Sequence, residues 1–498
     1  MTSVQNRPLL LSGNNIFALA LALLLFASCD MFAPIQTTQP GGDNKEEEEE
    51  DLGEVRGGRV YNPDTGEYED AESVMTEEMV TVKWEEVPTS EYEPIGSDRT
   101  TPIDTEDPID SEDEAGDNPD LRENYNVALM LPFLTNRFTT EDTEINKSSK
   151  WAIQFYAGAK VAFDKLEEEG INLTVSVMDT EANPNTVGGL LQDPAVQSAD
   201  LIMGSVQKSC AQRIANHAKT RQVPFVSPYI ASQGIAKENP YYIQVKPTLP
   251  THLEVLVKHV IDNNTKENIV LIRREDEKEA AIMQYLQQLH EDIAGSEYTT
   301  PLSEAIISDE TATLENFDIE PILKPSRKTV FVVTSWEDKA FVNSFLQKAF
   351  NAVREKAHEV TVYGMPQWSN FRGMDYEYYE KLNLHISSEQ YVDSYAADVR
   401  EFKKAYFDKY GETPTIEAFR GYDDMLYFGR MLQKHGVNFH EHFGEEQADM
   451  FHTRFELTPV TEVTTDAFGQ EEYGPVERFE NQFVYILEFD NYHFQPAK

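Results

Sequence analysis

The segment between residues 199 and 228 places the tightest limits on how this chain can fold. It begins with an apolar run at 201–203 that stops at Gly204 and Ser205, continues as a helical pattern, and becomes apolar again at 223–226. This order predicts strand, turn, helix and strand. Two strands joined by one helix form a right-handed crossover unit, in which both strands run parallel and end at the same edge of a sheet.

Polar residues follow both strands of this unit. Ser205 comes directly after the first strand, and Ser227 ends the second. Open α/β sheets bind ligands just beyond the carboxyl ends of their strands. If the protein holds a small molecule, the sequence predicts that it does so at this edge.

Alternating strands and helices continue on both sides of the segment. Before it, apolar runs and helical spacing predict a strand at 127–133 and a helix at 150–169. After it come a strand at 242–245 and a second α/β series between 269 and 363. This alternation is typical of α/β folds with mostly parallel sheets. Two successive series suggest two lobes that join near residues 246–250.

A later motif resembles one family. From Phe402 the sequence reads FKKAYFDKYGETPTIEAFRGYDD, which is similar to the Phe-x3-Tyr-x3-Tyr-Gly-x2-Pro-x3-Ala-x3-Tyr-Asp segment of type I periplasmic binding proteins. The branch concerned contains the amino-acid receptors of ABC importers. The Gly204 turn, the run VPFVSP at 223–228 and the run NPYYIQVKPT at 239–248 resemble further landmarks of that family in the same order. The resemblance covers about residues 125–485.

The resemblance implies an α/β, two-lobed fold, in which each lobe is a mostly parallel sheet flanked by helices. The chain would cross the hinge between the lobes several times. We expect residues 125–249 and 388–437 to form the first lobe, and residues 250–387 and 438–498 to form the second.

Strand-end residues of both lobes are the candidates for binding a ligand. The helix after Gly204 and Ser205 would direct its free backbone N–H groups toward a carboxylate, and in the family the loop after the fourth strand adds polar contacts. The candidates by position are Ser205, Gln207, Ser209, Ser227, Tyr229 and Ser232 in the first lobe, and Ser335, Trp336, Gln367 and Trp368 in the second. For each of them, capping or loop packing is the alternative role.

Two features depart from the family pattern. Amino-acid receptors carry an Asp-x2-aromatic-Gly segment after the first strand of the second lobe, whereas residues 273–278 of this chain read Arg-Arg-Glu-Asp-Glu-Lys. Tyr229 and Ile230 also place bulk where the family often has small residues. These changes argue against a free amino acid, and suggest a different ligand or an empty, structural cleft.

The N-terminus resembles a bacterial lipoprotein signal. An apolar run at 16–26 follows Arg7 and ends in Phe-Ala-Ser-Cys29, which is similar to a lipobox. Residues 1–28 would be the signal peptide, and Cys29 would carry a lipid whose acyl chains include palmitate. The alternative is a plain signal peptide or a short anchor with an incidental cysteine. If Cys29 carries the lipid, Cys210 has no disulfide partner, and a buried structural thiol is favoured over a reactive one.

An acidic segment separates this N-terminus from the α/β part. Residues 43–123 contain 30 acidic and 6 basic residues, a net charge of −24 out of −46 for the chain. We expect residues 29–124 to be a largely disordered linker. One alternating island at 79–84 is expected to be a short hairpin, paired with 59–61, or a docking peptide. The charge argues against nucleic acid as a partner, because phosphates would be repelled.

Catalytic motifs are missing from the sequence. It contains no Gly-x-Ser-x-Gly elbow, no Walker-type phosphate loop and no His-Glu-x2-His. The nearest metal candidate is His440, Glu441 and His442 with His452, but this spacing is not typical of zinc sites. We expect an exposed polar loop there, and neither an enzyme, nor a cofactor, nor a metal site.

The sequence therefore predicts a lipid-anchored, periplasm-facing binding protein whose lobes close on a small polar solute, amino-acid-like or derived from the cell wall. The alternative is an interaction module of the same fold that docks on and regulates an envelope or cell-wall enzyme, since the acidic linker would give it reach from the membrane. The lipid on Cys29 would be the only membrane attachment. Asp30, which follows it, has different meanings among bacteria, and we favour the outer membrane over the inner one.

Overall fold

The computed structural model describes residues 59–62, 67–70 and 121–497, apart from 140–144, 233, 296–299, 309–310, 312, 325–327, 357 and 466–470. These residues fall into two units, a small hairpin and the part from residue 121 onward. The signal peptide, Cys29 and most of the acidic segment lie outside the described residues. No helix among the described residues is long and apolar enough to cross a membrane.

Strand β1 (Arg59–Asn62) pairs antiparallel with β2 (Glu67–Asp70) in a small hairpin. The connection between the two strands contains Pro63, Asp64 and Gly66, which are turn-forming residues. Residues 79–84, the expected partner of 59–61, lie outside the described residues.

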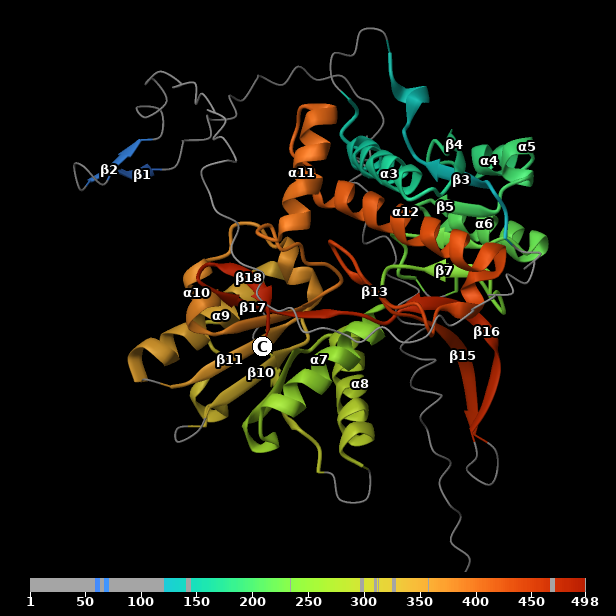
Figure 1. The fold of residues 1–498 in the computed structure, drawn as a ribbon. Helices are drawn as coiled ribbons and strands as arrows, with labels where there is room; N and C mark the ends of the chain where they lie inside the picture. Colours follow the sequence, from blue (N-terminus) through green and yellow to red (C-terminus); the bar gives the residue numbers. More distant parts are fainter. Residues whose placement is uncertain are drawn as a thin grey trace, which may run out of the picture. The chain divides into compact units, whose positions relative to one another are not determined.

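The part from residue 121 contains two seven-stranded sheets among its described residues (Figure 1). The first has the order β15-β16-β7-β6-β5-β3-β4. Its strands are β3 (Tyr125–Leu131), β4 (Leu173–Asp179), β5 (Leu201–Gly204), β6 (Phe225–Ser227), β7 (Tyr242–Gln244), β15 (Leu457–Thr465) and β16 (Glu471–Asn481). The strands from β3 to β7 pair in parallel. The crossover unit predicted from residues 199–228 is therefore present as β5, a helix and β6.

Helices cover both faces of the first sheet (Figure 1). They are α3 (Lys150–Glu168), α4 (Pro184–Leu190), α5 (Pro194–Gln197), α6 (Lys208–Arg221), α11 (Ala397–Tyr410) and α12 (Ile416–His435), with short 3₁₀ helices η1 (Thr135–Arg137) and η5 (Gly436–His442). Leu129 of β3 packs with α3, α11 and α12, whereas Ala128 and Met130 pack with α4, α5 and α6. Because successive side chains on a strand point to opposite faces, β3 lies between two helical layers.

The second sheet has the order β18-β17-β12-β11-β10-β8-β9. Its strands are β8 (Ile269–Arg274), β9 (Ser303–Ile307), β10 (Thr329–Val333), β11 (Val360–Gly364), β12 (Leu384–Ser388), β17 (Tyr485–Asp490) and β18 (His493–Pro496). Its helices are α7 (Leu249–Asn263), α8 (Glu277–Ala294), α9 (Lys339–Lys356) and α10 (Tyr376–Lys381), with 3₁₀ helices η2 (Lys266–Asn268), η3 (Glu320–Ile322) and η4 (Pro366–Asn370). The strands from β8 to β12 are parallel, and β17 pairs antiparallel with β12.

The C-terminal part of the chain divides between the two sheets, which corrects the expected assignment of 438–498 to the second lobe. β15 and β16 form a long antiparallel hairpin, and β16 adds to the first sheet in parallel with β7. Only β17 and β18 join the second sheet. The reason is burial, because Phe479 on β16 and Phe443 after η5 pack against each other in the core of the first lobe. The two-residue strands β13 (Ala448–Asp449) and β14 (Arg454–Phe455) pair nearby.

Three segments carry the described chain between the two sheets. The first follows β7 at 245–248, the second follows β12 at 389–396, and the third lies between β16 and β17 at 482–484. We call these the crossing segments.

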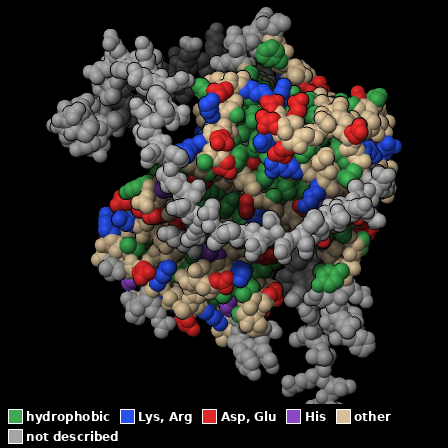
Figure 2. Space-filling model, in the orientation of Figure 1, with side chains coloured by type: hydrophobic (Ala, Val, Ile, Leu, Met, Phe, Trp, Pro, Cys, Tyr) green, Lys and Arg blue, Asp and Glu red, His purple; other side chains and the backbone are tan. Residues whose placement is uncertain are grey.

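On the face of the molecule shown in Figure 2, Lys and Arg side chains lie among Asp and Glu rather than in one basic patch.

Helices α3 and α12 approach each other closely at two glycines. A Cβ atom on Gly158 would lie 1.8 Å from the carbonyl oxygen of Ala418, and a Cβ atom on Gly421 would lie 2.0 Å from the carbonyl oxygen of Phe155. Backbone atoms cannot turn away as the end of a flexible side chain can. Both positions therefore need glycine for α12 to cover the first sheet.

We expect Gly421→Ala to lower the free energy of unfolding by about 2 kcal/mol or more, because overpacking typically costs about 1–3 kcal/mol even when side chains can yield. Gly189→Ala is the control, since a Cβ atom there has nothing within 4 Å. It should be neutral or raise stability by up to about 1 kcal/mol. Urea unfolding measures both, and equal stabilities of the two variants would contradict the close approach.

Candidate functional site

The turn after β5 is the structural centre of the first-lobe candidates. Gly204 has φ 131° and Ser205 has φ 68°, which is the left-handed region that residues other than glycine seldom adopt. A Cβ atom on Gly204 would lie 2.1 Å from the Met130 carbonyl oxygen, and the Ser205 N–H donates to the same oxygen at 2.9 Å. The Ser205 hydroxyl is buried, and among the described residues it has no hydrogen-bond partner.

The structure brings some first-lobe candidates together. Ser227 ends β6, which pairs directly with β5, and its side chain is fully buried. Gln207 occupies the N-cap position of α6 without capping it by its side chain, and both Gln207 and Ser209 are exposed. Ser232 is half-buried in the loop after β6. Ser205 and Ser227 thus share one strand edge, with Gln207 and Ser209 at the start of the helix that follows.

Tyr229 is held by side chains of its own chain. Its ring meets Trp151 edge-on at 4.7 Å between centroids, and the guanidinium of Arg420 lies 4.8 Å from the ring centroid. Its hydroxyl donates to Glu417 at 2.5 Å. Burial and the nearby charge of Glu417 raise the pKa of Tyr229 well above its usual value. The tyrosine is therefore a neutral hydrogen-bond donor.

Arg420 connects Tyr229 to the second crossing segment. Its Nη2 atom donates to Glu389 and to Gln390, each at 2.7 Å. Glu389 also pairs with Lys246 of the first crossing segment at 3.1 Å. Although burial alone would raise it, Lys246 and Arg420 hold the pKa of Glu389 well below its usual value. Two cations therefore neutralise one carboxylate that is 16% exposed.

Asp424 lies one helical turn beyond Arg420 on α12 and is fully buried. Neither of its carboxyl oxygens has a hydrogen-bond partner among the described residues. Burial raises the pKa of Asp424 well above its usual value, Asp423 and Glu417 raise it further, and Arg420 opposes them only in part. We expect this carboxyl group to carry a proton near neutral pH.

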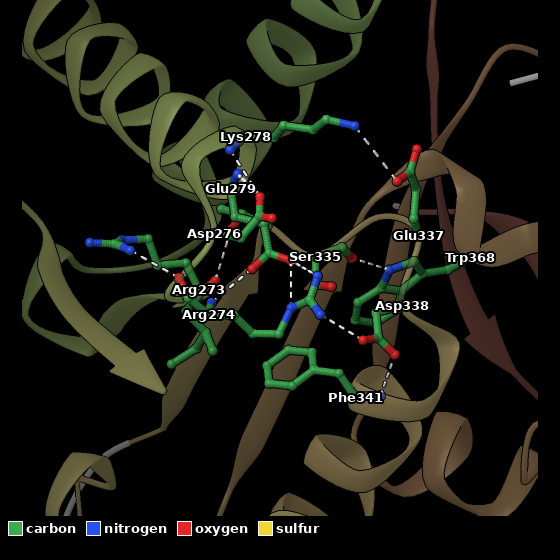
Figure 3. A network of polar contacts seen from close by, with 12 residues as sticks. Arg273, Arg274, Asp276, Lys278, Glu279, Ser335, Glu337, Asp338, Phe341 and Trp368 are labelled. Carbon is green, nitrogen blue, oxygen red and sulfur yellow. Dashed lines mark hydrogen bonds and ion pairs between the residues drawn. The ribbon is translucent and has the colours of Figure 1, made fainter. Parts of the chain in front are cut away.

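The charged segment that departs from the family pattern, residues 273–278, forms ion pairs with Glu279, Glu337 and Asp338 (Figure 3). Nε and Nη2 of Arg274 donate to one oxygen of Glu279 at 2.8 and 2.6 Å, and Nη1 donates to Asp338 at 2.6 Å. Asp276 caps α8 by accepting from the N–H groups of Lys278 and Glu279. Strand ends β8 and β10 are thus joined by an ion network.

The second-lobe candidates are mostly core residues. Trp336 and Trp368 are 4% and 1% exposed and pack in the core of the second lobe. The Trp368 indole donates to the Ser335 carbonyl at 2.7 Å, and Gly364 leaves room for its ring, since a Cβ atom there would lie 2.2 Å from it. For both tryptophans the structure shows the packing role that was the alternative. The Oγ atom of Ser335 and the Oε1 atom of Gln367 are buried without a partner among the described residues.

The histidines near residue 440 do not lie together in an exposed loop as expected. His440 is buried against Tyr241 and Phe479, and His452 is buried beside Asp423, to which its Nδ1 atom lies at 2.5 Å. His440 and His452 thus have different neighbours, whereas His442 is half-buried and stacks on His435. In the described part of the chain, no group of three His, Cys, Asp or Glu residues is arranged to hold a metal ion.

Cys210 is buried on α6 among the residues that cover one face of the first sheet. Burial raises the pKa of its thiol, which disfavours the reactive thiolate. The structure therefore places this cysteine as a packing residue.

Comparison with known proteins shows the fold. No family model matches this chain, and no curated protein matches it. A structure of a branched-chain amino acid ABC transporter from Rhodospirillum rubrum has a TM-score of 0.50 at 13% identity, and the match covers 74% of this chain and 99% of that one. This chain has the two-lobed fold of periplasmic binding proteins. At such low identity the likeness extends to the fold alone.

Other solved structures give weaker matches. A substrate-binding protein of an ABC transporter from Desulfitobacterium hafniense, in complex with Leu, has a TM-score of 0.44 at 13% identity, covering 75% of this chain and all of that one. An amino acid ABC transporter substrate-binding protein from Pseudomonas fluorescens also has a TM-score of 0.44, at 14% identity, covering 74% of this chain and 91% of that one.

From the sequence alone, Arg420, Asp424 and Glu389 were not identified as candidate site residues. A signal was present for two of them, because Arg420 and Asp424 are charged residues within a largely apolar helix.

We expect Arg274→Met to lower the free energy of unfolding by about 3 kcal/mol, because it leaves the carboxylate of Glu279, 3% exposed, without its cation. Arg273→Met is the matched control, since the Arg273 guanidinium donates only to the Arg274 carbonyl among the described contacts. The double variant Arg274→Met/Glu279→Leu should recover most of the loss. Urea unfolding measures all three, and equal losses for Arg273→Met and Arg274→Met would speak against the network.

Asp424→Asn should become more stabilising relative to the natural protein as pH rises from about 4 to 8. An unfolded aspartate ionises at a pKa of about 3.9, whereas the raised pKa of Asp424 keeps it protonated on folding. Its contribution to stability is therefore complete below about pH 4 and is lost as pH rises toward the folded pKa, by up to about 1.4 kcal/mol per pH unit.

The melting temperatures of both proteins across this pH range measure the effect. Asp408→Asn is the control, because the Asp408 side chain is exposed and pairs only with Lys404 of the same helix among the described contacts. Its profile should follow that of the natural protein. Parallel profiles for Asp424→Asn as well would refute a protonated carboxyl group.

Proposed function

We propose that this chain is a cell-envelope binding protein, anchored by lipid on Cys29 and facing the periplasm, that holds a small polar solute at the carboxyl edge of its first sheet. The observation that carries the proposal is the Ser205 hydroxyl, which is buried without a protein partner in the described chain and lies in a left-handed turn. A buried polar group without a partner is costly, and it is expected where a ligand completes the hydrogen bond.

The surroundings of Ser205 favour an anionic or hydroxyl-bearing group on the solute. The helix α6 begins just after the turn, and the N-terminus of a helix offers free backbone N–H groups and a partial positive charge. Ser227 lies at the end of the neighbouring strand. A carboxylate of an amino-acid-like or cell-wall-derived solute suits this set of donors.

A second candidate function is an interaction module of the same fold that docks on and regulates an envelope or cell-wall enzyme. The observation that favours it is that Tyr229 and Arg274, which stand at the two strand edges, are already paired within the chain. These two side chains have their polar groups paired without any solute. In that case the surface of the lobes, rather than the strand edges, would carry the function.

Thermal unfolding of the mature protein with amino acids and muropeptides separates the two functions. A solute at about 100 times its Kd stabilises the folded state by about 2.7 kcal/mol, which raises the melting temperature by several degrees. Ser205→Ala should reduce that rise, whereas Ser198→Ala, an exposed residue after α5, should leave it unchanged. No rise with any solute, together with capture of an envelope enzyme by the folded protein, would sink the solute-binding proposal and leave the second candidate.

A further inference from the structure

One side chain contacts groups that belong to different parts of the fold. The guanidinium of Arg420 lies over the ring of Tyr229, at the edge of the first sheet, and its Nη2 atom donates to Glu389 and Gln390, which follow β12 of the second sheet. Arg420 itself is 5% exposed. Water can therefore not readily replace its partners, and the position of the Arg420 side chain depends on Tyr229 on one side and on Glu389 and Gln390 on the other.

Glu389 extends this line of contacts to another crossing segment. It pairs with Lys246, which lies between β7 and α7. Two residues further on, the N–H of Thr248 donates to Glu480 at 2.9 Å, just before the third crossing segment. A cation–π contact, a hydrogen bond and an ion pair thus lead from Tyr229 to the second and first crossing segments, and the first segment is bonded to the end of β16, just before the third.

We propose that Arg420 is a positioning residue that couples the placement of Tyr229 to the arrangement of the crossing segments. The solute site that would use this coupling rests on the proposed function, but the coupling itself is a property of the protein contacts. When Glu389 moves relative to the first lobe, Arg420 either follows it and leaves the ring of Tyr229, or stays and loses its carboxylate. Either change alters the surroundings of Tyr229, which is also held by its hydrogen bond to Glu417 and its contact with Trp151.

The shape of its side chain explains why an arginine is needed at this position. A planar guanidinium can stack on an aromatic face and donate hydrogen bonds in its plane at the same time, whereas the ammonium of lysine is a compact point charge. The Nε atom of Arg420 is buried without a partner among the described residues.

Trp151 supplies a native reporter, because its ring lies 4.7 Å from the ring of Tyr229 and it is only partly buried. The emission of Trp151 in each protein is obtained by subtracting the fluorescence spectrum of the same protein that also carries Trp151→Phe. We expect Glu389→Gln to shift this emission, although no contact between Glu389 and Trp151 is described. In the Arg420→Lys background, the same substitution should shift it by less than half as much.

Asp408→Asn, a carboxylate-to-amide change at an exposed position, is the matched control and should leave the Trp151 emission unchanged. Far-UV circular dichroism shows that each variant is folded before its spectrum is compared. A folded Glu389→Gln protein with unchanged Trp151 emission would overturn the coupling, and so would an equal shift in the Arg420→Lys background. All variants are unfolded and refolded to remove any bound small molecule before their spectra are recorded, so this result is independent of whether the chain binds a solute.

Discussion

Two carboxylates, Glu389 and Glu480, hold together the segments by which the chain passes between its sheets. Glu389 accepts from Arg420 and Lys246, and Glu480, which is 1% exposed, accepts from Thr248. An ion pair that lies largely out of water is costly to break, because the partner that remains is a buried charge. The crossing segments can therefore rearrange only if these groups find new partners, and the first-lobe edge at Tyr229 is tied to that rearrangement.

Local patterns were sufficient to predict most elements of the first lobe. The helix expected at 150–169 coincides with α3, and the strand expected at 127–133 overlaps β3, because buried parallel strands are continuous apolar runs. The place of β16 could not be predicted in this way. Its partner β7 lies far earlier in the sequence, and an alternating Thr and Val pattern such as that of β15 suits the edge of either sheet.

The candidate site was only partly predictable for a similar reason. Position after a strand identified Ser205 and Ser227, but it did not show which way a side chain points, so Trp336 and Trp368 were expected at the edge and lie in the core. Arg420 falls within the motif that carries the family resemblance. The path of the crossing segments, which no local pattern encodes, decides that it meets a carboxylate.

We propose that the edge of the first sheet holds a small polar solute. Native mass spectrometry of the protein isolated from the cells that make it tests this proposal without knowledge of the solute. Part of the folded protein should be heavier by the mass of one small molecule, and denaturation should remove this mass but leave a covalent lipid in place. A folded protein that shows only the mass of the covalent chain, under several growth conditions, would contradict it.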